Sequence, residues 1–498
     1  MRVHLLFADQ DRDFPNVDES TSDLVRDLGV DTVLDSMAGG DPYLREVAAR
    51  VLLSGPLLPD QVAHRQAVVA DTICRPDDIR TLYQLAAEAS EAKRRVRGWF
   101  VGDHPSSILS WAVGILRDLH SHLLALHQYA LEHRGAFDSP GLTALMATVE
   151  RELDDAYLER VREHVRVLEF PRGVVLNARL GPGCTGTGFS LRLPARQPWY
   201  TQLLDPVSPG RGYTYRLPPR DEHGGRTLSR IRDQGVNSVA DAAARSADHV
   251  LDFFHRLRFE TGFYVACLNL HEQLRARGVA TCLPTAVPPT EPSLSCHGLV
   301  DAGLALRGRD PVVGNDIAAD GKRLVVLTGA NQGGKSTLLR GIGLAQLMLD
   351  AGIFVTAESY EGSTSTGLVT HYRREEDAGL EHGKLDDELD RMSAIVDRLV
   401  PGTVVLLDES FASTNEREGA EIAHGVVVSL LDAGIRVYYV THLFSLADRL
   451  AETKDSDHLF LRAQRSAEGS RTFRLEPGAP EPTSHARDLH EQFFPAGT

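Results

Sequence analysis

Paired cysteines, long apolar runs and an N-terminal targeting sequence are all missing from this chain of 498 residues. Its five cysteines are scattered and form no C-x-x-C pair, so we expect neither a disulfide framework nor a cysteine metal site. This usage predicts a reducing, cytoplasmic location. No run of about 20 apolar residues occurs, which predicts that no segment spans a membrane. The first residues, MRVHLLFADQDRDF, lack the basic start and long apolar core of a signal peptide.

The composition is that of an ordinary soluble protein, with 42% hydrophobic and 24% charged residues. The length predicts two to four domains at about 150 residues each. A net charge of −16 argues against nonspecific nucleic-acid binding by the whole surface. Between Pro171 and Arg232, however, ten arginines stand against three acids, a net of +7. Such a patch fits either a phosphate footprint or a solvated surface without a ligand.

The texture of the chain changes several times, which predicts a multidomain α plus α/β fold. Helical spacing covers Ser22–Arg166, with one long helix expected at Trp111–His133 and another at Leu142–Val165, and it returns at Val236–Arg277. Short strand-like pieces occupy 170–215, a Pro-rich linker is expected at Cys282–Pro292, and strands alternate with helices from His297. We therefore expect a short N-terminal segment at 1–40, a helical domain at 41–295 with a β-rich insert at about 170–232, and an α/β domain at 296–498.

One segment carries the strongest chemical signal. GANQGGKST follows the apolar run LVVL and precedes a helix-like stretch. Its spacing fits G-x-x-x-x-G-K-S, in which the backbone N–H groups, the lysine and the helix N-terminus bind phosphates and the serine hydroxyl binds Mg²⁺. We therefore expect ATP and Mg²⁺ as ligands. The predicted nucleotide-binding residues of this loop are Gly329, Ala330, Asn331, Gln332, Gly333, Gly334, Lys335, Ser336 and Thr337.

Two further strand ends carry polar residues suited to the same chemistry. TVVLLDES ends in Asp408 and Glu409, a candidate Mg²⁺ ligand and a candidate base for the attacking water. VYYVTH ends in His442, which could contact the γ-phosphate or orient the water. Glu358 follows the strand-like IFV and could sense Mg²⁺ or the γ-phosphate. A loop or a solvated helix remains the alternative for Glu358.

Together, TGANQGGKST, VVLLDES, STNEREG and YVTHLFSLAD resemble the ATPase domain of the MutS family of DNA mismatch-repair proteins, an ABC-type P-loop ATPase. YLREVAARVLLSGPLLPDQVAHRQAVVADTICRPDDIRTLYQLA resembles the start of that family's helical lever, or core, domain. The resemblance runs from about Asp41 to the C-terminus. It implies that the insert corresponds to the family's DNA clamp, which interrupts the lever helices.

The resemblance also implies roles for single residues. Ser336 and Asp408 would lie near Mg²⁺, Lys335 and Glu409 would be catalytic, and His442 would be the switch histidine. The family dimerises through its ATPase domains, each nucleotide being capped by the partner's signature segment. Here that segment contains Gly383, Lys384 and Glu388, where Gly383-Lys384 replaces the family's serine-containing start. Val312 stands near the adenine where the family often has an aromatic residue, and Glu358 where many members have glutamine.

The front of the chain departs most from the family. The mismatch-sensing and connector domains need on the order of 200 residues, and only about 40 precede the helical core. We therefore expect no recognition of single mismatches of the kind a full-length sensor achieves. The basic insert remains a candidate for binding the DNA backbone by shape. The candidate clamp residues are Arg192, Arg196, Arg211, Arg216 and Arg220.

Two functions follow from these observations. The first is a homodimeric, ATP-dependent DNA-binding protein of mismatch repair or a related repair or recombination process, in which ATP hydrolysis opens and closes a clamp on duplex, mismatched or branched DNA. The second is an ATP-switched protein-interaction factor that has lost DNA binding. The net charge of −16 and the expected absence of a sensor domain favour the second, and the basic insert favours the first.

Overall fold

The computed structural model describes most of the chain. The residues outside the description are 11, 16, 97–103, 172, 193–215, 219, 309, 331, 375–383, 454, 466–470 and 481–498. The chain divides into two compact units. Unit 1 comprises Met1–Val3, Thr81–Ala136 and Ala144–Arg258, and unit 2 comprises His4–Arg80, Phe137–Thr143 and Phe259–Thr498. No helix among the described residues is both long and apolar enough to cross a membrane.

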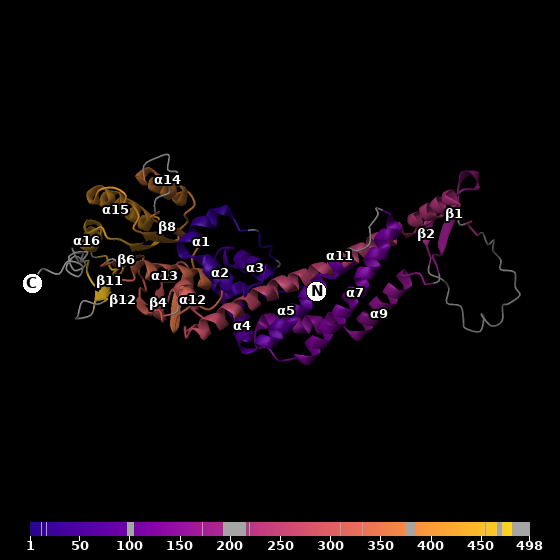
Figure 1. Cartoon of the computed structure of the whole chain (residues 1–498), viewed down its shortest axis with the longest axis horizontal. Coiled ribbons are helices and arrows are strands. Elements are labelled where there is room, and N and C mark those ends of the chain that lie inside the picture. Colours follow the sequence, from indigo (N-terminus) through magenta and orange to yellow (C-terminus); the bar gives the residue numbers. More distant parts are fainter. Residues whose placement is uncertain are drawn as a thin grey trace, which may run out of the picture. The chain divides into compact units, whose positions relative to one another are not determined.

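Unit 1 is helical and carries one small hairpin (Figure 1). Its elements are α6 (Ala92–Val96), α7 (Pro105–Glu132), α9 (Asp155–Leu168), β1 (Leu176–Leu180), η2 (Pro182–Cys184) and β2 (Gly186–Leu191), with parts of α5 (Pro76–Ser90), α8 (Pro140–Glu152) and α11 (Glu222–Ala276). β1 and β2 pair antiparallel. A cluster of apolar side chains from α7, α9 and α11 forms the core beside the hairpin. Leu176 of β1 lies against Gly235, where a Cβ atom would lie 2.3 Å from its Cδ2.

Two helices of this unit differ from the sequence expectation. The single helix expected at Leu142–Val165 is two helices, because Asp154 caps a new one by accepting a hydrogen bond from the Tyr157 N–H at 2.7 Å. The helix expected from Val236 begins earlier, at Glu222. There the Asp221 carboxylate accepts a hydrogen bond from the Gly224 N–H at 2.9 Å, so a side-chain cap starts the helix in spite of its glycines.

Unit 2 contains the two larger sheets. Its helices are η1 (Glu19–Thr21), α1 (Ser22–Leu28), α2 (Val30–Ala38), α3 (Pro42–Leu52), α4 (Pro59–Cys74), α12 (Ala302–Arg307), α13 (Lys335–Asp350), α14 (Lys384–Val396), α15 (Glu416–Asp432) and α16 (Phe444–Glu452). Its strands are β3 (Thr285–Val287), β4 (Leu294–Leu299), β5 (Asn315–Ala318), β6 (Leu324–Thr328), β7 (Ser359–Ser363), β8 (Leu368–Tyr372), β9 (Val404–Asp408), β10 (Arg436–Val440), β11 (His458–Arg465) and β12 (Arg471–Pro477).

The six-stranded sheet has the order β12-β11-β6-β10-β9-β8. Only the β11–β12 pair is antiparallel, and the other neighbours run parallel. Val440 at the end of β10 pairs with Leu327 on β6 and with Asp408 on β9. The carboxyl ends of these three strands therefore meet at one edge of the sheet, where open α/β sheets bind their ligands. A mixed four-stranded sheet, β3-β7-β4-β5, completes the unit.

Helices cover both faces of the six-stranded sheet. The apolar residues of α14, α15 and α16 pack with alternate residues of β6, β9 and β10 on one face. On the other face α13 lies against β8, β9 and β10, and α1 packs against β8 and α13 (Figure 1). Helix α1, from the short N-terminal segment, thus belongs to the packing of the α/β unit. The predicted linker at Cys282–Pro292 also contributes structure, because β3 pairs with β7 and Cys282 bridges to Val355.

The contact between α1, α13 and β9 gives a stability prediction. A Cβ atom on Gly343 of α13 would lie 2.6 Å from side-chain carbons of both Leu28 and Leu406. Gly343→Ala should therefore lower the free energy of unfolding by about 1 to 2 kcal/mol, because overpacking outweighs the better helix propensity. Chemical denaturation measures this change.

The matched control is Gly425→Ala on α15, where a Cβ atom would meet nothing within 4 Å. It should raise the free energy of unfolding by up to about 1 kcal/mol through helix propensity alone. Equal changes in the two variants would contradict the packing of α1 on α13.

Candidate functional site

The glycine-rich loop connects the end of β6 to the start of α13. Gly329 and Gly334 have φ angles of 110° and 92°, a backbone conformation that side chains disfavour. At Gly333 a Cβ atom would lie 2.8 Å from the Ala463 Cβ and 2.9 Å from the Ala330 carbonyl oxygen, so only glycine fits. The loop ends at the N-terminus of a 16-residue helix, which favours an anion.

Lys335 is held inside this loop. Its side chain is buried, with 5% exposure. The Nζ donates hydrogen bonds to the carbonyl oxygens of Gly329 at 2.8 Å and Ala330 at 2.9 Å. Burial lowers the pKa of Lys335, while the nearby charges of Glu409 and Asp408 raise it. The loop therefore surrounds a cation that the two carboxylates stabilise.

Ser336 and Asp408 bring two oxygen atoms together. The Ser336 Oγ donates a hydrogen bond to the Asp408 Oδ1 at 3.1 Å. Burial raises the pKa of Asp408 to about 6, and the bond from Ser336 opposes this shift. A hydroxyl and a carboxylate at this spacing form an oxygen donor set of the type that Mg²⁺ binds.

Glu409 occupies a different electrostatic environment from its neighbour. The His442 Nδ1 lies 3.6 Å from the Glu409 Oε1, and an Arg373 guanidinium nitrogen lies 3.5 Å from the Oε2. His442 is the main cause of a lowered pKa of Glu409. The Glu409 backbone has a φ angle of 52°, and its N–H donates to the Val440 carbonyl at 2.9 Å. The arrangement presents an ionised carboxylate beside Lys335 and Asp408.

A pocket of about 520 Å³ opens beside the loop. Its lining residues are Leu299, Asp301, Leu304, Gly308, Asp310, Pro311, Val312, Val313, Asn315, Gln332, Gly333, Gly334, Lys335, Ser336, Thr337, Leu338, Glu409 and Phe473. The pocket therefore has a polar end, formed by the loop and Glu409, and an apolar part that includes the side chains of Val312 and Val313.

Phe473 is a pocket residue that sequence reasoning missed. Its side chain is 47% exposed and its φ angle is 57°, a strained value for an aromatic residue. The Asn315 side chain holds this backbone, donating to the Phe473 carbonyl at 3.2 Å and accepting from the Leu475 N–H at 2.8 Å. Phe473 is thus an aromatic residue that lines the same pocket as Val312. The sequence contained no signal for Phe473, since β12 reaches the pocket only through the sheet.

The structure brings most of the predicted nucleotide residues together. Val312 and the loop residues from Gln332 to Thr337 line the pocket, and the carbonyls of Gly329 and Ala330 hold Lys335. Asn331 lies outside the described residues. Arg373, which contacts Glu409, was not predicted, although it follows the strand β8 as Glu409 follows β9.

Glu358 is the exception among these residues, because it does not line this pocket. It lines a second cavity with His297, Gly298 and Asp316. The expected strand at IFV is a bend with one bridge at Val355, and the Glu358 N–H donates to the His297 carbonyl at 2.9 Å. Glu358 is thereby directed to the four-stranded sheet, which does not support a role in sensing Mg²⁺ or the γ-phosphate.

The signature segment is described from Lys384 onward, and Gly383 lies outside the described residues. Lys384 is the first residue of α14. Glu388 is buried, with 3% exposure, and its Oε1 accepts a hydrogen bond from the Ser413 Oγ at 2.8 Å. Glu388 therefore faces the loop that follows β9 in its own chain.

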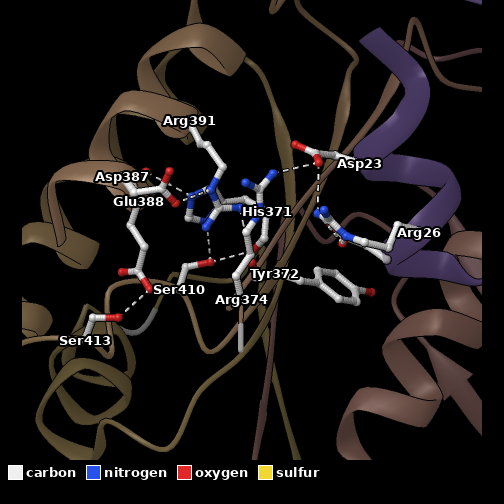
Figure 2. A network of polar contacts seen from close by, with 11 residues as sticks. Asp23, Arg26, His371, Tyr372, Arg374, Asp387, Glu388, Arg391, Ser410 and Ser413 are labelled. Atoms are coloured by element: carbon white, nitrogen blue, oxygen red, sulfur yellow. Dashed lines mark hydrogen bonds and ion pairs between the residues drawn. The ribbon is translucent and has the colours of Figure 1, made fainter. Parts of the chain in front are cut away.

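A buried histidine lies between α14 and that same loop (Figure 2). The His371 Nδ1 is 2.8 Å from the Ser410 Oγ, and its Nε2 is 3.0 Å from the Glu388 carbonyl oxygen. Burial and, to a smaller extent, the charge of Arg391 lower the pKa of His371 to about 4. The imidazole is therefore neutral at physiological pH.

The candidate clamp arginines lie in unit 1. Arg192, Arg216 and Arg220 are exposed, and Arg196 and Arg211 lie outside the described residues. Three further arginines of the basic stretch lie near the start of α11 and are also exposed; these are Arg226, Arg230 and Arg232. The hairpin and the first turns of α11 thus present arginines to solvent.

The neutral state of His371 gives a pH prediction. The unfolded chain takes up a proton near the ordinary value of 6.5 and the folded chain only near 4, so stability is fully present above 6.5 and is lost as pH falls toward 4. Between about pH 7.5 and about pH 5, this group should lower the free energy of unfolding by about 2 kcal/mol. Urea denaturation at both pH values should show a smaller loss for His371→Asn than for the wild type. Equal losses would mean that the folded imidazole is not neutral.

Two family models match the chain, and together they cover most of it. The model of the MutS2 N-terminal domain matches residues 59–277. The model of MutS domain V matches residues 325–481. The second match contains the glycine-rich loop and the strands β9 and β10.

Individual relatives agree with these matches. The DNA mismatch repair protein MutS of Porphyromonas gingivalis is 32% identical over 176 residues, covering 34% of this chain and 20% of the relative. The endonuclease MutS2 of Anaeromyxobacter sp. is 32% identical over 192 residues, covering 36% of this chain and 22% of the relative. The matches span about a fifth of the length of these relatives. With both parts of the chain matched by models of this kind, the protein belongs to the MutS family.

Proposed function

We propose that this chain is an ATP-dependent DNA-binding protein of the MutS type, which hydrolyses ATP in a dimer of ABC-type ATPase domains. The observation that carries the proposal is the meeting of three motifs at one edge of a parallel sheet. The loop around Lys335, the Ser336–Asp408 pair and the Glu409–His442 pair lie at the ends of β6, β9 and β10. Its place is DNA mismatch repair or a related repair or recombination process.

The pocket would hold ATP with its phosphates at the glycine-rich loop. Lys335 and the N-terminus of α13 supply positive charge at the polar end. The base would lie toward Val312, with Phe473 as an aromatic side chain available for stacking. The volume of about 520 Å³ is within the range of small-molecule sites.

Ser336 and Asp408 would hold Mg²⁺, since their oxygens are already 3.1 Å apart. Bound Mg²⁺ supplies positive charge to the phosphate oxygens. Glu409 would accept a proton from the attacking water. Its lowered pKa keeps the carboxylate ionised, and its 30% side-chain exposure leaves it accessible. His442 and Arg373 would orient that carboxylate, and His442 would report the state of the γ-phosphate.

The domain organisation that supports this function is a helical lever domain at 41–295 with a clamp-like insert, followed by an ATPase domain at 296–498. Dimerisation would place Lys384, at the N-terminus of α14, near the nucleotide of the partner. Lys384 could act there as a point charge, while Glu388 stays in contact with its own chain. The exposed arginines of the insert would contact the phosphates of DNA.

The nucleotide site is tested by two substitutions. Lys335→Ala removes the buried ammonium and should weaken Mg·ATP binding by about a hundredfold, measured by titration calorimetry.

Glu409→Gln should leave binding within a few-fold of the wild type but lower ATP turnover by about a hundredfold, because the base is lost.

The matched controls are Lys322→Ala and Glu361→Gln in the same unit. Lys322 is half-buried, Glu361 is exposed, and neither lines the pocket. Both should behave as the wild type. Normal turnover by Glu409→Gln would remove Glu409 from the catalytic role.

DNA binding is tested through its salt dependence. Changing Arg216 and Arg220 together to glutamine should lower the slope of log affinity against log salt by about 2, because two phosphate contacts are lost. Arg398→Gln, an exposed arginine of unit 2, is the control and should leave the slope unchanged.

An unchanged slope in the double variant would show that the insert is not the footprint. If the protein retains no linear, mismatched or branched DNA at low salt in any nucleotide state, that outcome would favour the alternative function, an ATP-switched protein-interaction factor. The net charge of −16 is the observation behind this alternative.

A further inference from the structure

We propose that His371 is a positioning residue, which fixes the backbone turn that presents Glu409 and ties this turn to α14. The inference rests on the proposed ATPase function and concerns a residue outside the pocket. His371 is fully buried on β8. Its neighbour Tyr372 pairs with Asp408 on β9, so the imidazole lies next to the strand end that carries Asp408 and Glu409.

The turn after β9 is strained. Glu409 has a φ angle of 52° and Phe411 one of 61°, both in the left-handed region that side chains disfavour. Such a conformation is costly and persists only where the surrounding structure holds it. Ser410 lies between the two and is fully buried. Whatever holds Ser410 therefore also holds the direction in which the Glu409 carboxylate points.

His371 supplies several of the contacts that hold this turn. The Ser410 Oγ donates to the His371 carbonyl oxygen at 2.6 Å and lies 2.8 Å from its Nδ1. The ring of Phe411 stacks on the imidazole, with centroids 5.5 Å apart and an interplanar angle of 23°. A third contact comes from Tyr439, whose hydroxyl donates to the Ser410 carbonyl at 2.7 Å. One side chain thus contacts two successive residues of the strained turn.

The tautomer of His371 follows from its partners. The Glu388 carbonyl can only accept, so the His371 Nε2 carries the hydrogen and the Nδ1 is an acceptor. The single hydroxyl hydrogen of Ser410 then has two acceptors, the Nδ1 and the carbonyl of His371. The imidazole therefore links the turn to α14 through one directed chain of hydrogen bonds.

Helix α14 is joined to the same turn a second time. The Glu388 Oε1 accepts from the Ser413 Oγ, while its buried Oε2 has no partner among the described residues. Figure 2 shows both links, and it shows Arg391 of α14 beside the end of β8. The Arg391 guanidinium donates to the Tyr372 carbonyl at 3.2 Å. A displacement of α14 would therefore move His371 and Ser410 and, with them, Glu409.

ATP hydrolysis should therefore depend on this chain of contacts, whereas ATP binding should not. Lys335, Ser336 and the pocket do not contact His371 through any interaction found among the described residues. Loss of the imidazole should leave the phosphate loop in place and allow the Glu409 carboxylate to change direction. Small misplacements of a catalytic group reduce rates strongly.

The test uses His371→Asn, Ser410→Ala and the double variant, with ATP and Mg²⁺. His371→Asn should lower kcat by at least about tenfold while the Kd for Mg·ATP stays within about twofold. Ser410→Ala, the smaller change, should give a similar loss of kcat and answers the question if His371→Asn does not fold. The double variant should lose no more than the more damaged single variant, because both act through one contact.

The control is His458→Asn on β11, a second buried histidine of the same unit, which interacts with Asp455 and Asp457. It should leave kcat unchanged, and thermal unfolding of all variants separates loss of fold from loss of position. Three outcomes would overturn this inference and leave the proposed function standing. They are an unchanged kcat in His371→Asn and Ser410→Ala, equal losses of binding and turnover, and additive losses in the double variant. If the wild type hydrolyses no ATP, the proposed function fails and the inference fails with it.

Discussion

The parallel pairing of β6, β10 and β9 is the constraint on which the candidate site depends. Each strand is followed at once by a chemically active segment, and the register places Leu327, Val440 and Asp408 side by side. The glycine-rich loop, His442 and the Asp408–Glu409 pair are separated in the chain by up to about a hundred residues, yet they meet at one sheet edge as parallel strand ends do. A shift of any one strand by a single residue would turn its apolar side chains to the opposite face and break the layers on both sides.

Different surroundings then give the two neighbouring carboxylates different chemistry. Asp408 and Glu409 are adjacent carboxylates, but burial raises the pKa of the first to about 6 and His442 lowers that of the second. In active sites, two neighbouring titratable groups with different catalytic roles typically have surroundings that move their pKa values apart. The buried Lys335 is kept beside both carboxylates by two loop carbonyls. Ser410, which follows Glu409, contacts His371, and His371 contacts α14. The carboxylates and the helix are therefore linked by packed, hydrogen-bonded residues.

Prediction from the sequence worked best where chemistry lies within one continuous motif. Gly333 and Lys335 of the predicted loop both line the pocket, because local backbone shape and the start of a helix fix their positions. It worked less well where a cap decides the structure, since Asp154 divides an expected helix and Asp221 starts α11 early. Glu358 followed an apolar run but joins another sheet. Phe473 and Arg373 were missed because each reaches the site from a strand whose place in the sheet no local pattern reveals.

The sequence by itself determined the family resemblance, the alternation of strands and helices, and the identity of the residues that could bind a nucleotide. These depend on spacing within short segments, where residue type and backbone shape are directly linked. Only the tertiary structure decided that Glu388 faces its own chain, that His371 is buried against Ser410, and that α1 packs on the α/β unit. Such contacts arise from strand order and layer packing. These bring together residues that lie 25 and 39 positions apart in the first two cases and hundreds apart in the third, and no local pattern in the sequence links them.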